Sequence, residues 1–224
     1  LGATAIGTTV TAAPGYPELA TQYLSELTGF KFILGDDLVE ATSDTGAYVL
    51  LSGVLKRTST KLTKICNDIR LLSSGPRCGL NEINLPQMQP GSSIMPGKVN
   101  PVIPEALCMA CAQVMGLHQA ISIAGQSGNF QLNVMLPLIA CDIDESLQLL
   151  SVAMIALADK AIAGLQVRQD TVAAALDRNP ILVTALNPVI GYENAAKIAK
   201  RAYAERRPVL QVALEDSGLD DKTL

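Results

Sequence analysis

The chain has 224 residues, of which 49% are apolar and 17% charged, and its formal net charge is −4. This apolar content excludes an intrinsically disordered chain, because burying so much apolar surface can offset the conformational entropy lost on folding. The acidic balance argues against a nucleic-acid partner, since a polyanion attracts basic surfaces. An aromatic content of only 4%, with no Trp, also argues against surfaces that stack on bases.

Two helices are predicted in the first part of the chain. A short one follows Pro14 and ends near Thr28, where Gly29 provides a helix stop signal. A much longer one is predicted from about Thr42 to Leu71, because apolar residues recur at spacings of about three or four and their multiples. These residues are Ala47, Leu51, Val54, Leu55, Leu62, Ile65 and Ile69.

Residues 73–100 lack helical periodicity altogether. Gly and Pro residues interrupt the whole range and exclude a helix there: Gly75, Pro76, Gly79, Pro86, Pro90, Gly91, Pro96 and Gly97. Compact domains rarely contain unstructured connections longer than about 12–15 residues unless these have a function. This loop is therefore the first candidate for a functional site.

Helical patterns resume after the loop. One helix is predicted from Pro101 to about Ser122, with Asn100 as its N-cap and apolar residues on nearly every side. The next runs from about Gln131 to Ala163, with a kink expected at Pro137.

After Gly164 only short helices are predicted. They are placed at about 170–176, 181–186, 192–204 and 209–215. Since strand patterns are nearly absent, the expected class is all-α. We expect part of a long-helix bundle over residues 1–164 and a small helical domain over residues 165–224.

A membrane-spanning helix is not predicted, although no Asp, Glu, Lys or Arg lies between Glu105 and Asp142. Such a helix needs about 20 nearly uninterrupted apolar residues. Polar residues interrupt every window of that length: Gln113, His118, Gln119, Ser122, Gln126, Ser127, Asn129, Gln131 and Asn133. We interpret the stretch as helix buried against other protein, with no membrane partner.

The start of the chain gives two expectations. No basic and apolar leader opens it, so a cytoplasmic location is expected. Leu1 stands where an initiator Met would be, which indicates a piece of a longer protein.

The five cysteines form an odd and unevenly spaced set: Cys66, Cys78, Cys108, Cys111 and Cys141. A disulfide framework is therefore not expected, and a reducing compartment fits. Cys108 and Cys111 match C-x-x-C but have no second ligand pair, so we predict a buried helical pair and no metal site.

The end of the loop carries the groups best suited to chemistry. The segment Gly91–Pro101 offers the hydroxyls of Ser92 and Ser93, the ammonium of Lys98 and the amide of Asn100. They come just before a helix N-terminus, which favours carboxylate or phosphate because of its unpaired N–H groups and partial positive charge.

Two common sites are not indicated. The segment lacks the spacing of a phosphate-binding P-loop. The single histidine, His118, lies well inside the following helix, so it is predicted to be a buried, hydrogen-bonded core residue and not part of a Ser-His-Asp triad.

The loop matches in full the pattern G-S-x-x-M-x-x-K-x-N, through Gly91, Ser92, Met95, Lys98 and Asn100. In this pattern the chain resembles the aspartase/fumarase superfamily of helical lyases. Further segments resemble landmarks of that superfamily: 2–8, 67–70, 74–77 and 186–188.

Two segments favour one branch of the superfamily. Residues 40–48 and 80–86 resemble aspartate ammonia-lyases more than class II fumarases, whereas residues 182–188 are closer to fumarases. The resemblance therefore favours aspartate ammonia-lyase and leaves class II fumarase as the alternative.

The resemblance implies a reversible deamination of L-aspartate to fumarate and ammonia, with no cofactor. Ser92 would be the base that removes the Cβ proton, and a Gly-rich turn could stabilise its alkoxide through backbone N–H groups. Binding of the small dicarboxylate substrate is implied for Lys98, Asn100, Met95 and Ser93. Glu105 would be a supporting carboxylate.

The resemblance also implies an assembly. Members of the superfamily have a central five-helix bundle and are homotetramers whose active sites combine loops from three subunits. Two further substrate-binding regions of the superfamily, both from its amino-terminal half, are missing here. We therefore expect a carboxyl-terminal half that is inactive alone. A non-catalytic helical oligomerisation module is the other alternative, although intact Ser92, Lys98 and Asn100 argue against it.

Overall fold

The computed structural model describes residues 2–219. It divides into two compact units, Leu1–Arg70 with Gln87–Ala163 and Leu71–Pro86 with Gly164–Leu224. Within the described range the only strands are β1 (Ile83–Asn84) and β2 (Gln166–Val167), which pair antiparallel. The predicted all-α class is confirmed. Gly164 as a domain boundary stays a prediction.

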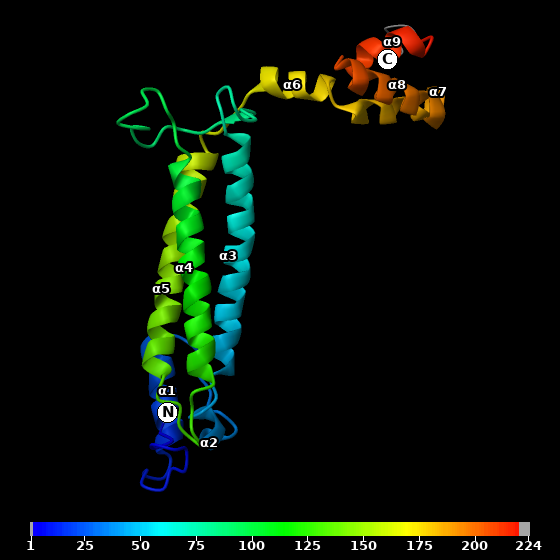
Figure 1. Cartoon of the computed structure of the whole chain (residues 1–224). Coiled ribbons are helices and arrows are strands. Elements are labelled where there is room, and N and C mark those ends of the chain that lie inside the picture. The colour runs from blue at the N-terminus through cyan, green and yellow to red at the C-terminus, as the bar shows by residue number, and fades with distance from the viewer. Residues whose placement is uncertain (1, 220–224) are drawn as a thin grey trace. The chain divides into compact units, whose positions relative to one another are not determined.

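The first unit consists of five helices, and its three long ones lie side by side (Figure 1). They are α1 (Tyr16–Thr28), α2 (Leu38–Ala41), α3 (Gly46–Leu72), α4 (Val102–Gly125) and α5 (Leu136–Leu157), the last continuing in a π-helical turn, Ala158–Ile162. As predicted, α1 ends at Gly29, whose left-handed φ of 74° lets its N–H reach the Ser25 carbonyl.

Pro137 is the second residue of α5 and does not kink the helix, so that prediction is wrong. The cause is Asn133, which is almost fully buried in the connection between α4 and α5. Its Nδ2 donates to the carbonyl of Ala124 at 3.0 Å, and its Oδ1 accepts the N–H of Met135 at 2.9 Å. These bonds hold a non-helical connection, after which proline suits the first turn of a new helix.

The core of the first unit joins α3, α4 and α5. One apolar cluster contains Cys66, Leu107, Cys111, Val114, Leu150, Leu157 and Ala161, and a second contains Ile121, Ala124, Ile139 and Ile143. Other large apolar side chains on the same helices remain exposed, among them Met109, Val152 and Ile155. The apolar surface of α4 and α5 therefore exceeds what this chain covers.

Helix α4 is long and apolar enough to cross a membrane by length and composition alone. Core helices also pass that test, and Leu107, Cys111, Val114 and Ile121 of α4 are buried in the two clusters. The prediction that α4 is buried by protein stays in place.

The second unit contains short helices; α7 was not predicted, and the other four have bounds within two residues of those predicted. They are α6 (Gln169–Asp177), a 3-10 helix (Pro180–Leu186), α7 (Asn187–Ile190), α8 (Tyr192–Glu205) and α9 (Val209–Asp216). Their apolar core includes Val183, Ile198 and Val212. Arg201 and Arg207 tie α8 to α9 through Glu205, Glu215 and Asp216.

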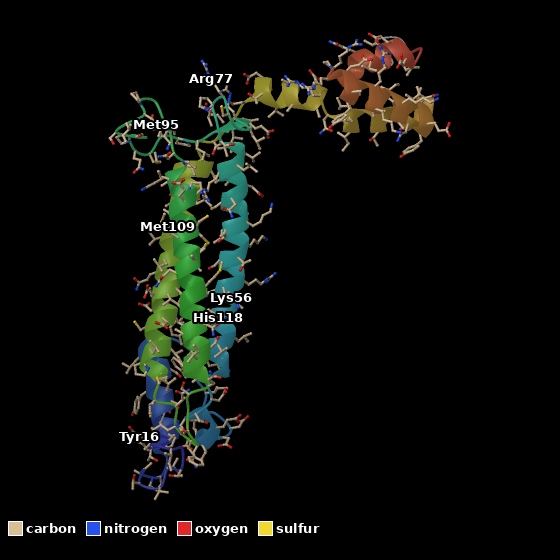
Figure 2. The ribbon with its side chains drawn as sticks, in the orientation of Figure 1. Tyr16, Lys56, Arg77, Met95, Met109 and His118 are labelled. Atoms are coloured by element: carbon tan, nitrogen blue, oxygen red, sulfur yellow. The ribbon has the colours of Figure 1, made fainter. Side chains whose placement is uncertain are left out.

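His118 is hydrogen-bonded inside the helical unit, as predicted, but it is less buried than the sequence suggested. Its Nδ1 lies 2.5 Å from Oγ of the buried Ser52 on α3, and the ring itself is half-buried. Burial of the ring and the nearby Lys56 ammonium lower the pKa of His118. Figure 2 shows Lys56 and His118 on neighbouring stretches of α3 and α4.

The cysteines of the C-x-x-C pattern also lie at the contact of α4 with α3. Cys111 is fully buried, and Sγ of the half-buried Cys108 lies 3.8 Å from Oδ1 of Asn67. Burial raises the pKa of the Cys66 thiol, their neighbour on α3, to about 12. Burial also raises the pKa of the Cys111 thiol, so Cys66 and Cys111 are poor nucleophiles near neutral pH, as expected of structural cysteines.

Lowering the pH should weaken the first unit through His118. The pKa of His118 in the folded chain lies below its pKa in the unfolded chain. As the pH falls below about 6.5, the unfolded chain therefore binds more protons than the folded chain, and this stabilises the unfolded state. The free energy of unfolding, measured with urea from pH 8 to pH 5, should fall over this range. His118→Gln should reduce this slope, and an unchanged slope would contradict the assignment.

Asp142 on α5 is a buried acidic residue whose carboxyl group is not fully hydrogen-bonded within residues 2–219. It is 6% exposed, and its Oδ2 has no hydrogen-bond partner within residues 2–219. Burial of the carboxyl and the nearby Glu145 raise the pKa of Asp142. The charged carboxylate therefore destabilises the isolated chain.

Asp142→Asn should stabilise the isolated chain by roughly 1 kcal/mol at pH 7, because it removes a buried charge without changing shape. A raised folded pKa means that the destabilisation is absent below about pH 4 and grows as the pH rises through the folded pKa. Urea unfolding of both proteins at pH 4 and pH 7 measures this. A variant less stable at pH 7 would show that the carboxylate has a partner.

Candidate active-site loop

Residues 91–100, called the signature loop below, lead into α4. Within the loop, the N–H of Lys98 donates to the carbonyl of Met95 at 3.2 Å and closes a four-residue turn. Pro96 and Gly97 occupy its centre, and Gly97 has a φ of 78°. This is the residue pattern of a type II turn, in which the third position favours glycine. The turn therefore determines where the backbone of Lys98 lies.

Ser92 is held in a polar environment made by its own loop. Its Oγ accepts the N–H of Ile94 at 3.2 Å and that of Met95 at 3.1 Å. Two N–H donors aimed at one oxygen stabilise negative charge on it. The stabilisation of a Ser92 alkoxide by backbone N–H groups, expected from the sequence, thus has a geometric basis in this chain.

The two ends of the loop meet at a neck formed by Gly91, Lys98 and Asn100. Nδ2 of Asn100 donates to the carbonyl of Gly91 at 3.0 Å. A Cβ at position 91 would lie 1.1 Å from the carbonyl oxygen of Lys98. Only glycine allows this approach, so the neck depends on the residue type at position 91.

The prediction that Asn100 is the N-cap of α4 is wrong. The cap position is Pro101, without a side-chain cap bond, while the carbonyl of Asn100 accepts the N–H of Val102 at 2.9 Å. The reason is the neck, because the amide of Asn100 is directed back to Gly91.

The structure places five of the six predicted site residues in the signature loop. Ser92 is half-buried, whereas Ser93, Met95 and Lys98 are exposed and Asn100 is half-buried. Figure 2 shows Met95 on the loop outside the helices, and its side chain is 51% exposed, so it packs little in this chain. Their roles toward a substrate stay predictions.

Lys98 and Glu105 have no mutual or other ion pair among the described residues. Lys98 is exposed, and Glu105 lies half-buried in the first turn of α4. The Lys98 ammonium is thus available to an anion from outside the chain. No group of three or more His, Cys, Asp or Glu residues within 2–219 is arranged to hold a metal ion.

The neck was not predicted from the sequence. A glycine and an asparagine nine residues apart carry no general signal for a side-chain bond across a loop. Pro96 and Gly97 indicated only that this segment is not helical.

Comparison with known proteins gives two matching family models. The model described as lyase matches residues 1–116, and the one described as the fumarase C C-terminus matches residues 182–224. Among curated relatives, a class II fumarate hydratase of Xylella fastidiosa is 56% identical over 98% of this chain and 46% of its own length. An aspartate ammonia-lyase of Pseudomonas aeruginosa is 53% identical over the whole chain and 47% of its own length.

Two solved structures are also similar to this chain. A fumarate lyase:delta crystallin from Brucella melitensis superposes with a TM-score of 0.95 at 48% identity, over 100% of this chain and 48% of that one. A class II fumarase from Schistosoma mansoni gives a TM-score of 0.88 at 36% identity, over 99% of this chain and 50% of that one.

The chain belongs to the aspartase/fumarase superfamily of lyases. It spans about half the length of the curated relatives it matches.

Gly91→Ala should open the neck without unfolding the helices. The added methyl would displace the Lys98 carbonyl and separate Asn100 from Gly91, so the amide resonances of Ile94 and Met95 should shift in a two-dimensional NMR spectrum. Melting temperature should change little, because the loop lies outside both apolar clusters.

The matched control is Gly116→Ala, where a Cβ meets nothing within 4 Å. It should leave the loop resonances in place and stabilise α4 by up to about 1 kcal/mol. Unchanged loop resonances in Gly91→Ala would contradict the described neck.

Proposed function

We propose that this chain is the carboxyl-terminal part of a carbon–nitrogen lyase that reversibly converts L-aspartate to fumarate and ammonia. The proposal rests on the signature loop. In this loop Ser92 Oγ accepts hydrogen bonds from two backbone N–H groups. Lys98, a few residues further on, is exposed and has no ion pair within residues 2–219. Membership of the lyase superfamily gives the reaction class.

In the proposed reaction Ser92, as an alkoxide, removes a proton from Cβ of the substrate. The electron pair left on Cβ delocalises into the adjacent carboxylate, which becomes a dianion that Lys98 stabilises. The pair then forms the Cα–Cβ double bond of fumarate while the Cα–N bond breaks and ammonia leaves. Stabilisation is strongest when the dianion develops, so Lys98 contributes to the rate as well as to binding.

Malate, with water as the leaving group, is the second candidate substrate. It is supported by the fumarate hydratases among the relatives and by the resemblance of residues 182–188 to fumarases. We favour aspartate because residues 40–48 and 80–86 resemble aspartate ammonia-lyases.

The complete active site is proposed to need more protein than this chain. Relatives are about twice as long. Exposed apolar side chains on α4 and α5 also border an open groove of about 450 Å³ whose lining includes Ile103, Leu107, Leu149 and Val152. We propose a homotetramer of the longer enzyme and no activity for the isolated chain. A reducing, cytoplasmic setting is supported by five free cysteines.

The test combines this chain with the amino-terminal half of a longer relative. The purified chain, alone and coexpressed with the amino-terminal half of the Pseudomonas aeruginosa aspartate ammonia-lyase, is assayed for fumarate absorbance with L-aspartate and with malate. We expect activity only in the complex, and with aspartate. Turnover of malate alone would establish the second candidate. No turnover and no saturable binding of either dicarboxylate would favour a non-catalytic helical module.

Ser92→Ala should reduce turnover in that complex at least a thousandfold, since a missing nucleophile or base typically costs this much or more. Substrate affinity should change little, because the hydroxyl acts in proton removal. Thr60→Ala, on the exposed face of α3, is the control and should retain activity. Turnover within tenfold of the parent complex would remove Ser92 as the base.

A further inference from the structure

We propose that a second copy of this chain docks in the open groove between α4 and α5 through the exposed side of its own α3. The inference names a contact for the proposed homotetramer. It therefore rests on that part of the proposed function and not on the proposed reaction.

The wall of the groove on α5 has an acidic end and an apolar end. It belongs to a line of residues at alternating spacings of three and four, which is the spacing of a helix face that packs against another helix. In chain order the line contains Asp142, Glu145, Leu149, Val152 and Ala156. The last four line the groove of about 450 Å³, and Asp142 extends the line by one position. The groove thus changes from acidic to apolar along α5.

The acidic end has no cation beside it. Neither Asp142 nor Glu145 forms an ion pair within residues 2–219. Glu145 accepts a bond of 3.4 Å from Nε2 of Gln113, and Oδ2 of the buried Asp142 has no hydrogen-bond partner. A buried carboxylate of this kind is costly until a positive partner reaches it. A helix that fits the groove should therefore carry basic residues at one end and apolar residues at the other.

The exposed side of α3 has this composition. At spacings of four, three, four and three it carries Leu50, Val54, Arg57, Lys61 and Lys64. Leu50 is 72% and Val54 50% exposed, and all three basic residues are exposed. Lys64 pairs with Asp68, whereas Arg57 and Lys61 have no ion pair in the described part of the chain. This line, called the α3 stripe below, is apolar first and basic afterwards.

The α3 stripe and the line on α5 match when the two helices run antiparallel. Residues 50–64 and 142–156 have the same length, about 21 Å at 1.5 Å per residue. Antiparallel pairing then places Lys61 opposite Glu145 and Lys64 opposite Asp142, while the two apolar ends cover one another. Parallel pairing would place the basic residues on the apolar end. The charges therefore select the antiparallel arrangement.

Both surfaces belong to every copy of the chain. A copy that inserts its α3 stripe into a neighbour still has a free groove of its own, so the contact can be repeated or returned within a symmetric assembly. This makes a second copy the partner that supplies both the apolar and the basic half of the match.

The test exchanges one charge on each surface. Self-association of the purified chain is measured by sedimentation equilibrium in about 0.1 M salt, because salt screens exposed charge pairs. Lys61→Glu and Glu145→Lys should each weaken self-association at least tenfold, since each brings like charges together. An equimolar mixture of the two variants should associate again, because native Lys61 then meets native Glu145 and the two exchanged charges also attract each other.

Lys200→Glu is the matched control, since Lys200 is exposed on α8 and the net charge changes equally. It should leave self-association unchanged. Lys61 and Glu145 are exposed, so both variants should keep the circular dichroism spectrum of the parent. A parent chain that stays monomeric at submillimolar concentration would overturn the proposal. So would reversals without effect, or a mixture that does not recover.

The competing occupant is a helix of the amino-terminal half of the longer relative. Binding of that half to this chain, prevented by Glu145→Lys but not by Lys61→Glu, would assign the groove to it and overturn the proposal. None of these measurements requires turnover. An inactive complex would refute the proposed reaction and leave the docking result standing, whereas an active complex of a chain that does not self-associate would refute the docking alone.

Discussion

The signature loop depends on one close approach, that of the Gly91 backbone to the carbonyl of Lys98. There is no room for a side chain at this point, so the two ends of the loop come together only with glycine at position 91. The turn at Pro96 and Gly97, the bond from Asn100 and the N–H groups around Ser92 all lie within this closed segment. The proposed base, Ser92, and the ammonium of Lys98 are thereby kept within one short stretch of chain.

The helices hold the end of the loop in place, and they also leave apolar surface exposed to solvent. Helix α4 begins two residues after Asn100, at Val102, and enters the core within two turns. On the outer faces of α4 and α5, large apolar side chains stay in contact with solvent, and Asp142 is buried without a full set of partners. Both features are costly for an isolated chain. Both features fit the finding that the relatives of this chain are about twice as long.

The sequence predicted the helices well because their signals are local. Apolar periodicity located α3, a continuous apolar run after Pro101 located α4, and Gly29 marked the end of α1. Pro137 was misplaced because the burial of Asn133, which ends the helical run before it, depends on contacts that are distant in sequence. Asn100 was misassigned for a similar reason. Its residue type suits an N-cap, but the Gly91 carbonyl across the loop competes for the same amide. The residues of the candidate site were identified from a sequence motif. Their hydrogen bonds were not predicted, because these bonds depend on the folded conformation of the loop.

The central claim is that Ser92 removes a proton from carbon. It is tested most directly by following exchange of the Cβ hydrogens of L-aspartate in D₂O by NMR, using this chain in complex with the amino-terminal half of its Pseudomonas aeruginosa relative. We expect deuterium at Cβ with the unaltered chain and none with Ser92→Ala. Deuterium incorporation at the same rate in both would show that another group is the base.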